Sequence, residues 1–374
     1  MKIVVFGGAG DVGSRAVEDL VVSEGVTSVT IADRDTVSAM RLEARLRGKG
    51  APVRVRTVDA RSHGALVLTM KGHDVAASAL GPFFEFEPRL VRAAIDARVD
   101  YCSICDDWDA ADKVMQFHDE ARRVGTRVLV GLGASPGLSN VGVSCLADRV
   151  DEVDRVEVFV FLPPDMGGGG AGVEHGLHIM TGKVASWREG RKELVDACSE
   201  HRVVELPGPG RVKLWNMGHS EPLTLPPYLP GVRNIDFFMG FGVGSELLIY
   251  PARAGAFKFG PVRRRLLQFA ALVDRIVVRD KRGNGAVRVD LWGKKAGRDV
   301  HHMLCGVGTM RDVTGLSLSA GALMLGSNNV LVSEGGVYPP EACLSPSIFF
   351  PAMQARGVAV FEDVSMITPM RLSA

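Results

Sequence analysis

Short apolar runs alternate with amphipathic segments through the first 130 residues of the chain. Residues 3–6 are apolar side chains in a row, which is typical of a strand buried on both faces of a parallel sheet. Helical spacing of apolar residues follows, and the alternation then repeats along the sequence. Further strands are expected at 28–32, 53–58, 75–79, 100–104 and 127–130. Regular alternation of strands and helices predicts a parallel sheet with helices on both faces.

The pattern changes at 131–140, a Gly- and Pro-rich stretch that precedes an apolar helix. Beyond residue 154 the expected strands alternate apolar and polar positions, so one face of each strand should meet water. These strands are 156–161, 202–206, 211–215, 232–239 and 286–293. The alternation predicts an antiparallel or mixed sheet, and therefore a second domain of α+β type.

The later segments are more varied. Residues 163–172 contain four consecutive glycines, and we expect a mobile loop there, either a lid or a disordered surface loop. Helices are expected again at 316–325 and 347–355, followed by a short strand at 358–361.

A glycine motif lies directly after the first expected strand and opens the first helix. Its residues, Gly8-Ala9-Gly10-Asp11-Val12-Gly13, form a G-x-G-x-x-G, and an acidic residue ends the second strand about twenty positions later. We expect Gly8 to permit a tight turn, Gly10 to let a pyrophosphate approach, and Gly13 to let helix and strand pack closely. The N–H groups at the helix start would bind the anion. This context predicts a dinucleotide site rather than a glycine turn that binds nothing.

The remaining cofactor contacts are expected where the parallel strands end, because ligands of such sheets lie at the carboxyl edge. Asp33 should accept hydrogen bonds from the adenosine ribose hydroxyls and repel a 2′-phosphate, which favours NAD. Arg34 complicates this choice, since an arginine there can stack on adenine or pair with that phosphate, so NADP stays an alternative. The other positions expected at the cofactor cleft are Asp59, Ala79 and Gly81.

Composition excludes several other classes of function. The formal net charge is +1 and the charges are dispersed, so neither nucleic acid nor an anionic membrane is expected as a partner. No apolar run approaches the roughly eighteen residues of a membrane span, and the opening strand leaves no room for a signal peptide. Cys102 and Cys105 form a C-x-x-C without a second pair for zinc. We therefore expect reduced structural thiols, no metal site and a cytoplasmic location.

Several patches resemble the saccharopine dehydrogenase-like oxidoreductases, which include lysine dehydrogenases and carboxynorspermidine dehydrogenases. The first is the motif GAGDVG, and the second, VDYCSICDD at 99–107, is similar to the family's VDYVDISDE. GASPGLSN at 133–140 is similar to its G-x-x-PG-x-x-N, and GHSEPLTLP at 218–226 to its H-x-E-P-x-TLP. GVYPPE at 336–341 is similar to its closing GV-x-x-PE. Together these patches span nearly the whole chain.

The resemblance implies an α/β fold, in which a Rossmann doubly wound parallel sheet is interrupted by an inserted α+β substrate and dimerisation domain. We expect a dinucleotide-binding domain at 1–132, the substrate domain at 133–310, and a C-terminal segment at 311–374 that packs back on the Rossmann domain. The resemblance also implies hydride transfer between a nicotinamide cofactor and the C–N bond of an amino acid or amino-acid/polyamine conjugate, in a homodimer. The sequence departs from the family at Pro226-Pro227, where a member often has Pro-Arg.

Oxidising an amine needs a proton acceptor for nitrogen and an activated water for imine hydrolysis, and the protein must contribute these acid–base groups. Asp106 is the first candidate, because it follows a strand beside the expected nicotinamide position. The competing interpretation is a helix cap, which we favour for its neighbours Asp107 and Asp109.

Three more residues are candidates for acid–base work. His175 follows the glycine-rich segment, where a hydrated histidine could titrate near neutrality, and the alternative is an ordinary exposed histidine. His219 and Glu221 occupy alternating positions, so both would face one side of an extended segment. A structural turn held by Pro222 is the competing account.

Other interpretations stay open at this level. A substrate carboxylate needs a cationic partner, and the sequence does not choose among Lys183, Arg188, Arg233 and Arg253. An alcohol-acting Rossmann dehydrogenase is an alternative, although no Tyr-x-x-x-Lys pair follows the fourth strand. A non-enzymatic dinucleotide sensor is another, since a fold does not fix a function.

Overall fold

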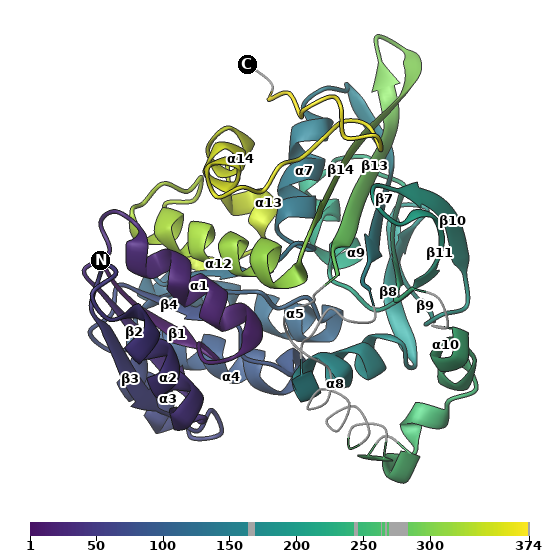
Figure 1. The fold of residues 1–374 in the computed structure, drawn as a ribbon. Helices are drawn as coiled ribbons and strands as arrows, with labels where there is room; N and C mark the ends of the chain where they lie inside the picture. Colours follow the sequence, from purple (N-terminus) through teal and green to yellow (C-terminus); the bar gives the residue numbers. More distant parts are fainter. Residues whose placement is uncertain (164–168, 243–245, 263, 266–267, 269–282, 373–374) are drawn as a thin grey trace. The chain divides into compact units, whose positions relative to one another are not determined.

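The structure is a computed structural model, and it describes residues 1–372 except 164–168, 243–245, 263, 266–267 and 269–282 (Figure 1). The described chain divides into two compact units. The first comprises Met1–Leu138 and Arg311–Arg356, and the second comprises Ser139–Met310 and Gly357–Ala374. The first unit is therefore discontinuous in sequence. None of the described helices combines the length and hydropathy that a bilayer span requires.

The first unit is built on one parallel sheet. Its elements in chain order are β1 Lys2–Phe6, α1 Asp11–Val22, β2 Ser28–Asp33, α2 Thr36–Leu46, β3 Val53–Thr57, α3 His63–Met70, β4 Val75–Ser78, α4 Phe83–Ala97, β5 Asp100–Ser103, α5 Trp108–Met115, α6 His118–Val124, β6 Arg127–Val130, α12 Met310–Gly326, β15 Gly336–Tyr338, α13 Pro340–Cys343 and α14 Pro346–Ala355.

The strand order is β15-β6-β5-β4-β1-β2-β3, and every neighbouring pair is parallel. Residues Ile3 to Phe6 of β1 are fully buried, as expected for a central strand covered by helices on both faces. The order reverses beside β1, and an open sheet of this kind binds its ligand at the carboxyl edge near that reversal.

Helices cover the sheet in two groups (Figure 1). Helix α1 packs against α2, whereas α3 packs against α4, and α4 against α5. The amphipathic spacing of α1 explains its orientation, because Ala16, Val17 and Leu20 are buried while its polar stripe points outward. The returning segment adds α12 and completes the sheet with β15, which pairs with β6.

The second unit is built on a mixed sheet. Its elements in chain order are α7 Leu138–Ala147, β7 Glu152–Phe161, α8 Gly169–Ile179, β8 Lys183–Arg188, β9 Arg191–Asp196, β10 His201–Leu206, β11 Gly210–Asn216, α9 Glu221–Thr224, η1 Pro226–Tyr228, β12 Asn234–Gly240, α10 Glu246–Arg253, η2 Ala256–Lys258, β13 Gly285–Lys295 and β14 Arg298–Gly308.

The strands of the second unit follow the order β10-β11-β12-β7-β13-β14, with β8 and β9 attached to β12. Among the described strands of this unit, only β12 and β7 pair in parallel, and the other pairs are antiparallel. Alternate residues of β7, such as Val156 and Val158, enter the main core with side chains of α7, α8 and α10. The opposite face carries a smaller cluster that includes Phe159 and Phe238. The predicted fold class, a Rossmann sheet with an α+β domain, is confirmed.

Two local expectations need correction. Part of the segment 163–172 is not a loop, because helix α8 begins at Gly169; residues 164–168 lie outside the described residues. The helix forms despite its glycines because Leu177 and Ile179 are buried in the core, and packing outweighs helix propensity. The expected strand at 358–361 is reduced to an isolated bridge at Phe361, which pairs with Cys305 and Pro369.

Candidate functional site

The glycine motif forms a tight turn between β1 and α1. The N–H of Gly10 donates to the carbonyl oxygen of Gly7 at 3.0 Å, and Gly7 has a φ of 67°. The left-handed backbone conformation therefore belongs to Gly7, one residue before the glycine that we expected to make the turn. The sequence does contain a hint of this role, because Gly7 directly precedes Gly8 and only glycine adopts the left-handed conformation without strain.

Close packing explains the other glycines. A Cβ atom on Gly13 would lie 2.1 Å from the carbonyl oxygen of Gly7, and one on Gly8 would lie 2.8 Å from the carbonyl oxygen of Val5. Both distances are too short for a side chain. Helix α1 has Gly10 as its N-cap, and no side chain caps its first N–H groups. These N–H groups suit the phosphates of a dinucleotide, because an uncapped helix start carries partial positive charge.

Asp33 lies at the carboxyl end of β2 and is tied to the glycine motif. Its Oδ2 atom accepts a hydrogen bond from the N–H of Ala9 at 3.0 Å, and its Oδ1 atom accepts one from the N–H of Asp35 at 3.0 Å. Each carboxylate oxygen can accept further bonds, so Asp33 can still receive ribose hydroxyls. Arg34 is exposed directly beside it.

The other expected cofactor positions lie at the ends of neighbouring strands. Ala79 follows β4, and its N–H donates to the carbonyl oxygen of Phe6 at 2.9 Å. Gly81 is joined to Pro82 by a cis peptide bond, immediately before α4. Asp59 follows β3 and is exposed, and its Oδ1 atom accepts the N–H of Arg61 at 2.9 Å. Asp59 therefore stabilises a local turn.

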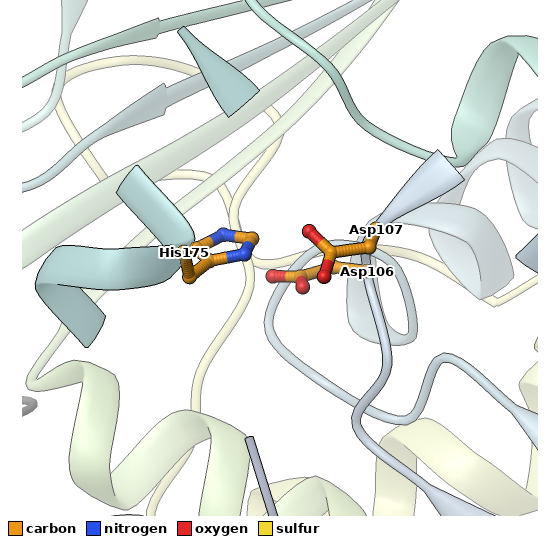
Figure 2. A group of neighbouring side chains, drawn as sticks. All are labelled: Asp106, Asp107 and His175. Atoms are coloured by element: carbon orange, nitrogen blue, oxygen red, sulfur yellow. The ribbon is translucent and has the colours of Figure 1, made fainter. Parts of the chain in front are cut away.

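Asp106 and Asp107 occupy adjacent positions in the loop after β5 (Figure 2). The Oδ2 atom of Asp107 accepts the backbone N–H of Phe84 at 3.0 Å, so this buried carboxylate caps the start of α4. Capping is the role that we favoured for Asp107, although the helix that it caps is not the one that follows it. Asp106 is only half-buried. Asp109 lies in the first turn of α5 and pairs with Lys113 at 3.6 Å.

A buried acid that we did not single out from the sequence lies beneath this loop. Glu87 of α4 accepts hydrogen bonds from the Tyr101 hydroxyl at 2.9 Å and the Ser103 hydroxyl at 2.5 Å, both on β5. Burial raises the pKa of Glu87 to about 7, although the two hydrogen bonds favour the ionised form. The negative charge of Asp107 also raises this pKa. Glu87 therefore titrates close to neutral pH.

The C-x-x-C of β5 and its loop is not a reactive thiol pair. Cys102 and Cys105 are both buried and free, and burial raises the pKa of each thiol well above its ordinary value. A thiol in such surroundings is protonated and a poor nucleophile. This geometry supports the structural role that we expected for both residues.

The second unit contains a buried acid–base pair. The Nδ1 atom of His219 lies 2.5 Å from the Oε2 atom of Glu221, and the two side chains are 1% and 0% exposed. The imidazole stacks on the ring of Phe237 with centroids 3.9 Å apart. The segment is not extended as we expected, because Glu221 begins the short helix α9 and Pro222 follows in its first turn.

His175 lies on α8, where it is half-buried (Figure 2). We expected a hydrated histidine after the glycine-rich segment, and His175 instead lies half-buried within a helix. His178 follows on the same helix, and it is also half-buried.

Most of the basic residues considered for a substrate carboxylate already have acidic partners within the second unit. Lys183 pairs with Asp196 at 3.0 Å, Arg188 pairs with Glu200 at 2.9 Å, and Arg233 pairs with Glu189. Arg253, at the end of α10, has its guanidinium carbon 5.9 Å from the ring centroid of Trp215.

Residues 3–129 match the sequence model of the family described as saccharopine dehydrogenase NADP binding domain. The family resemblance is confirmed. Carboxynorspermidine synthase of Vibrio cholerae serotype O1 is 24% identical over 236 residues, which are 57% of this chain and 56% of that enzyme. The matched region is thus little more than half of the relative's length.

A solved structure supports the fold over the whole chain. The apo form of histidine-tagged saccharopine dehydrogenase (L-Glu forming) from Saccharomyces cerevisiae has a TM-score of 0.70 and 15% identity, and covers 97% of this chain and 99% of that chain. At this identity the match shows the fold alone. Residues 3–129 thus resemble the NADP binding domain of saccharopine dehydrogenases, and the chain shares the fold of this solved saccharopine dehydrogenase.

Proposed function

We propose that this chain is an NAD(P)-dependent oxidoreductase that acts on the C–N bond of an amino acid or an amino-acid/polyamine conjugate. The observation that carries the proposal is the glycine motif, which forms a side-chain-free turn in a domain that matches the NADP-binding family. Supporting it is the His219–Glu221 pair in the second unit. The nicotinamide supplies hydride transfer when bound, while the chain contributes orientation and proton transfer.

His219 and Glu221 are suited to holding a proton. If Nδ1 carries the hydrogen, it donates to the Glu221 carboxylate, and this negative charge favours transfer of a proton from the substrate nitrogen to the imidazole. Stacking on Phe237 fixes the plane of the ring, so the direction of Nε2 is also fixed. We propose Asp106 and His175 as further acid–base residues in the same reaction, with Asp107 holding the Asp106 loop to α4.

For the cofactor we propose NAD in preference to NADP. The Asp33 carboxylate is held beside the glycine motif by its bond to the Ala9 N–H, and a fixed negative charge there repels a 2′-phosphate. Exposed Arg34 favours the opposite choice, which makes NADP the alternative. Gly8, Gly10, Asp11, Val12, Gly13, Asp59, Ala79 and Gly81 complete the proposed cofactor site.

A substrate screen tests the proposal. The purified chain is mixed with amino acids or polyamine precursors and with NAD or NADP, and the absorbance of the reduced nicotinamide is followed. We expect turnover with at least one amine substrate, faster with NAD at equal cofactor concentrations. Turnover only with alcohols would contradict the proposed bond. Flat traces in both directions with measurable cofactor binding would support a dinucleotide sensor instead.

We further propose that the enzyme is a homodimer in the cytoplasm. The dimer rests on the family resemblance, and light scattering of the purified protein tests it. The location is supported by the six cysteines, which are all free and buried, as in a reducing compartment. Microscopy of a fluorescently tagged chain in its native cell would test the location, and a signal outside the cytoplasm would contradict it.

A further inference from the structure

The returning helix α12 lies directly against α1, the helix that opens at the glycine motif (Figure 1). A Cβ atom on Gly315 of α12 would lie 2.9 Å from the carbonyl oxygen of Val12 and 2.7 Å from the Cβ atom of Arg15. Only a glycine permits such a close approach. The first turn of α12 is thereby brought beside the first turns of α1.

Arg311, in that first turn of α12, reaches across the polar stripe of α1. Its Nη2 atom donates to the Oε2 atom of Glu18 at 2.9 Å and to the hydroxyl of Ser14 at 3.3 Å. Its Nε atom lies 3.6 Å from the Oδ1 atom of Asp11. The Arg311 side chain is only 21% exposed, so solvent screens these charges less than it screens a surface pair. One guanidinium thus lies close to two acids of α1, Asp11 in its first turn and Glu18 farther along the helix.

Asp11 is an unfavourable neighbour for a dinucleotide. It occupies the first turn of α1, where the N–H groups would receive the two negative charges of a pyrophosphate. Its own negative charge repels such a ligand unless a cation offsets it. Asp11 belongs to a cluster of ion pairs in which three acids face three arginines, so the formal charges sum to zero. The acids are Asp11, Glu18 and Asp312, and the arginines are Arg311, Arg15 and Arg45. Removing one arginine leaves the cluster negative.

We propose that Arg311 is a positioning residue for the dinucleotide, which offsets Asp11 and Glu18 so that the glycine motif accepts a pyrophosphate. The inference rests on the proposed function, and it assigns the C-terminal segment a part in cofactor binding. Arg311 acts through the charge of Asp11, and direct contact with the cofactor is not needed.

Calorimetric titration with NAD, ADP-ribose and adenosine tests this role. NAD and ADP-ribose contain a pyrophosphate, whereas adenosine does not. We expect Arg311→Gln to weaken both pyrophosphate ligands about fivefold at low salt, as one unscreened charge near the site would, and to leave adenosine unchanged. The difference should shrink at high salt. Arg311→Lys, which keeps the charge, should bind nearly as the wild type does, even if Arg311→Gln folds poorly.

Two further variants separate charge from structure. The double variant Asp11→Asn/Arg311→Gln should recover dinucleotide affinity, because it also removes the negative charge of Asp11 that repels the pyrophosphate. Arg356→Gln is the matched control, since Arg356 also comes from the returning segment and pairs with an acid of α1, Asp19, at 2.8 Å, but farther from the motif. It should bind dinucleotides normally.

The possible outcomes are distinct. Unchanged affinity of Arg311→Gln for ADP-ribose would overturn this inference alone, and so would a double variant as weak as the single one. A wild-type chain that binds neither NAD nor NADP would overturn the proposed function, and this inference with it.

Discussion

The Nδ1 atom of His219 lies 2.5 Å from the Oε2 atom of Glu221 inside the second unit, and neither side chain reaches solvent. Burying such a pair is costly unless both members are hydrogen-bonded, and here Nδ1 and Oε2 lie within hydrogen-bond distance of each other. The imidazole also stacks on Phe237. A structural turn would not require a titratable pair at this place, because two apolar side chains would pack as well.

The first prediction concerns this pair. Glu221→Gln removes the negative charge that orients and supports the His219 imidazole while it keeps the shape of the side chain. We expect kcat to fall about 100-fold, the lower end of what general acid–base groups contribute, with a displaced pH profile and little change in KM. Glu205→Gln, at an exposed position of β10, is the control and should be neutral. If Glu221→Gln kept full activity, the His219–Glu221 pair would have only a structural role.

The second prediction separates the adjacent carboxylates after β5. Asp107→Ala removes the acceptor for the Phe84 N–H, so the free energy of unfolding should fall by about 1 kcal/mol, as for a lost helix cap. Asp106→Ala should cost little stability and lower kcat instead. Urea unfolding and steady-state kinetics on both variants measure the two effects. The assignment is wrong if the effects are exchanged.

The third prediction concerns the cofactor. Asp33→Asn keeps an acceptor for the Ala9 N–H and removes the charge that repels a 2′-phosphate. The ratio of kcat/KM for NAD to that for NADP should fall about tenfold, with most of the change in the KM for NADP. Arg34→Ala should move the ratio the other way. Glu43→Gln on α2 provides a control that also removes one negative charge. A ratio that Asp33→Asn leaves unaltered would rule out charge repulsion as the cause.

The fourth prediction follows from the buried Glu87. Burial raises its pKa from 4.5 to about 7, so between these values the folded chain holds a proton that the unfolded chain has released. The free energy of unfolding should therefore fall as pH rises from about 4.5 to about 7, by up to about 3 kcal/mol. The side chain in Glu87→Gln does not titrate, so this variant should lose the part of the pH dependence of unfolding that Glu87 causes.

Urea unfolding at pH 5.5 and pH 8 measures the effect of Glu87→Gln. The control is Glu85→Gln, which removes a half-buried acid of the same helix and should keep the wild-type pH dependence. Equal pH dependence in the wild type and in Glu87→Gln would show that Glu87 is ionised throughout.

The fold could be predicted because its signals are local. The apolar run of β1, the glycine motif and Asp33 follow one another within the first 33 residues, and each constrains the next. The alternation in β7 likewise indicated a mixed sheet, but the expected wet face is wrong for this strand, because its residues 156–160 are buried on both faces. Periodicity reports burial, and burial decides the layers of a fold.

The rest depended on contacts between distant residues. Glu87 is one of several acids in an amphipathic helix, and nothing near it in the sequence shows that Tyr101 and Ser103 enclose it. Asp107 was predicted to be a cap, but its partner Phe84 lies on a helix earlier in the chain. The start of helix α8 was mistaken for a loop because glycine propensity is local, whereas the burial of Leu177 is a tertiary effect.

The discontinuity of the first unit has a consequence for synthesis. Strand β6 ends at Val130, and β15, which pairs with it, begins at Gly336, so the ribosome must add roughly 200 residues before the sheet is complete. At typical elongation rates this takes on the order of 10 to 40 s. Throughout that time β6 is an exposed edge that can pair with another nascent chain. A folding helper that shields this edge, or rapid folding of the second unit, would decide how much of the newly made protein escapes aggregation.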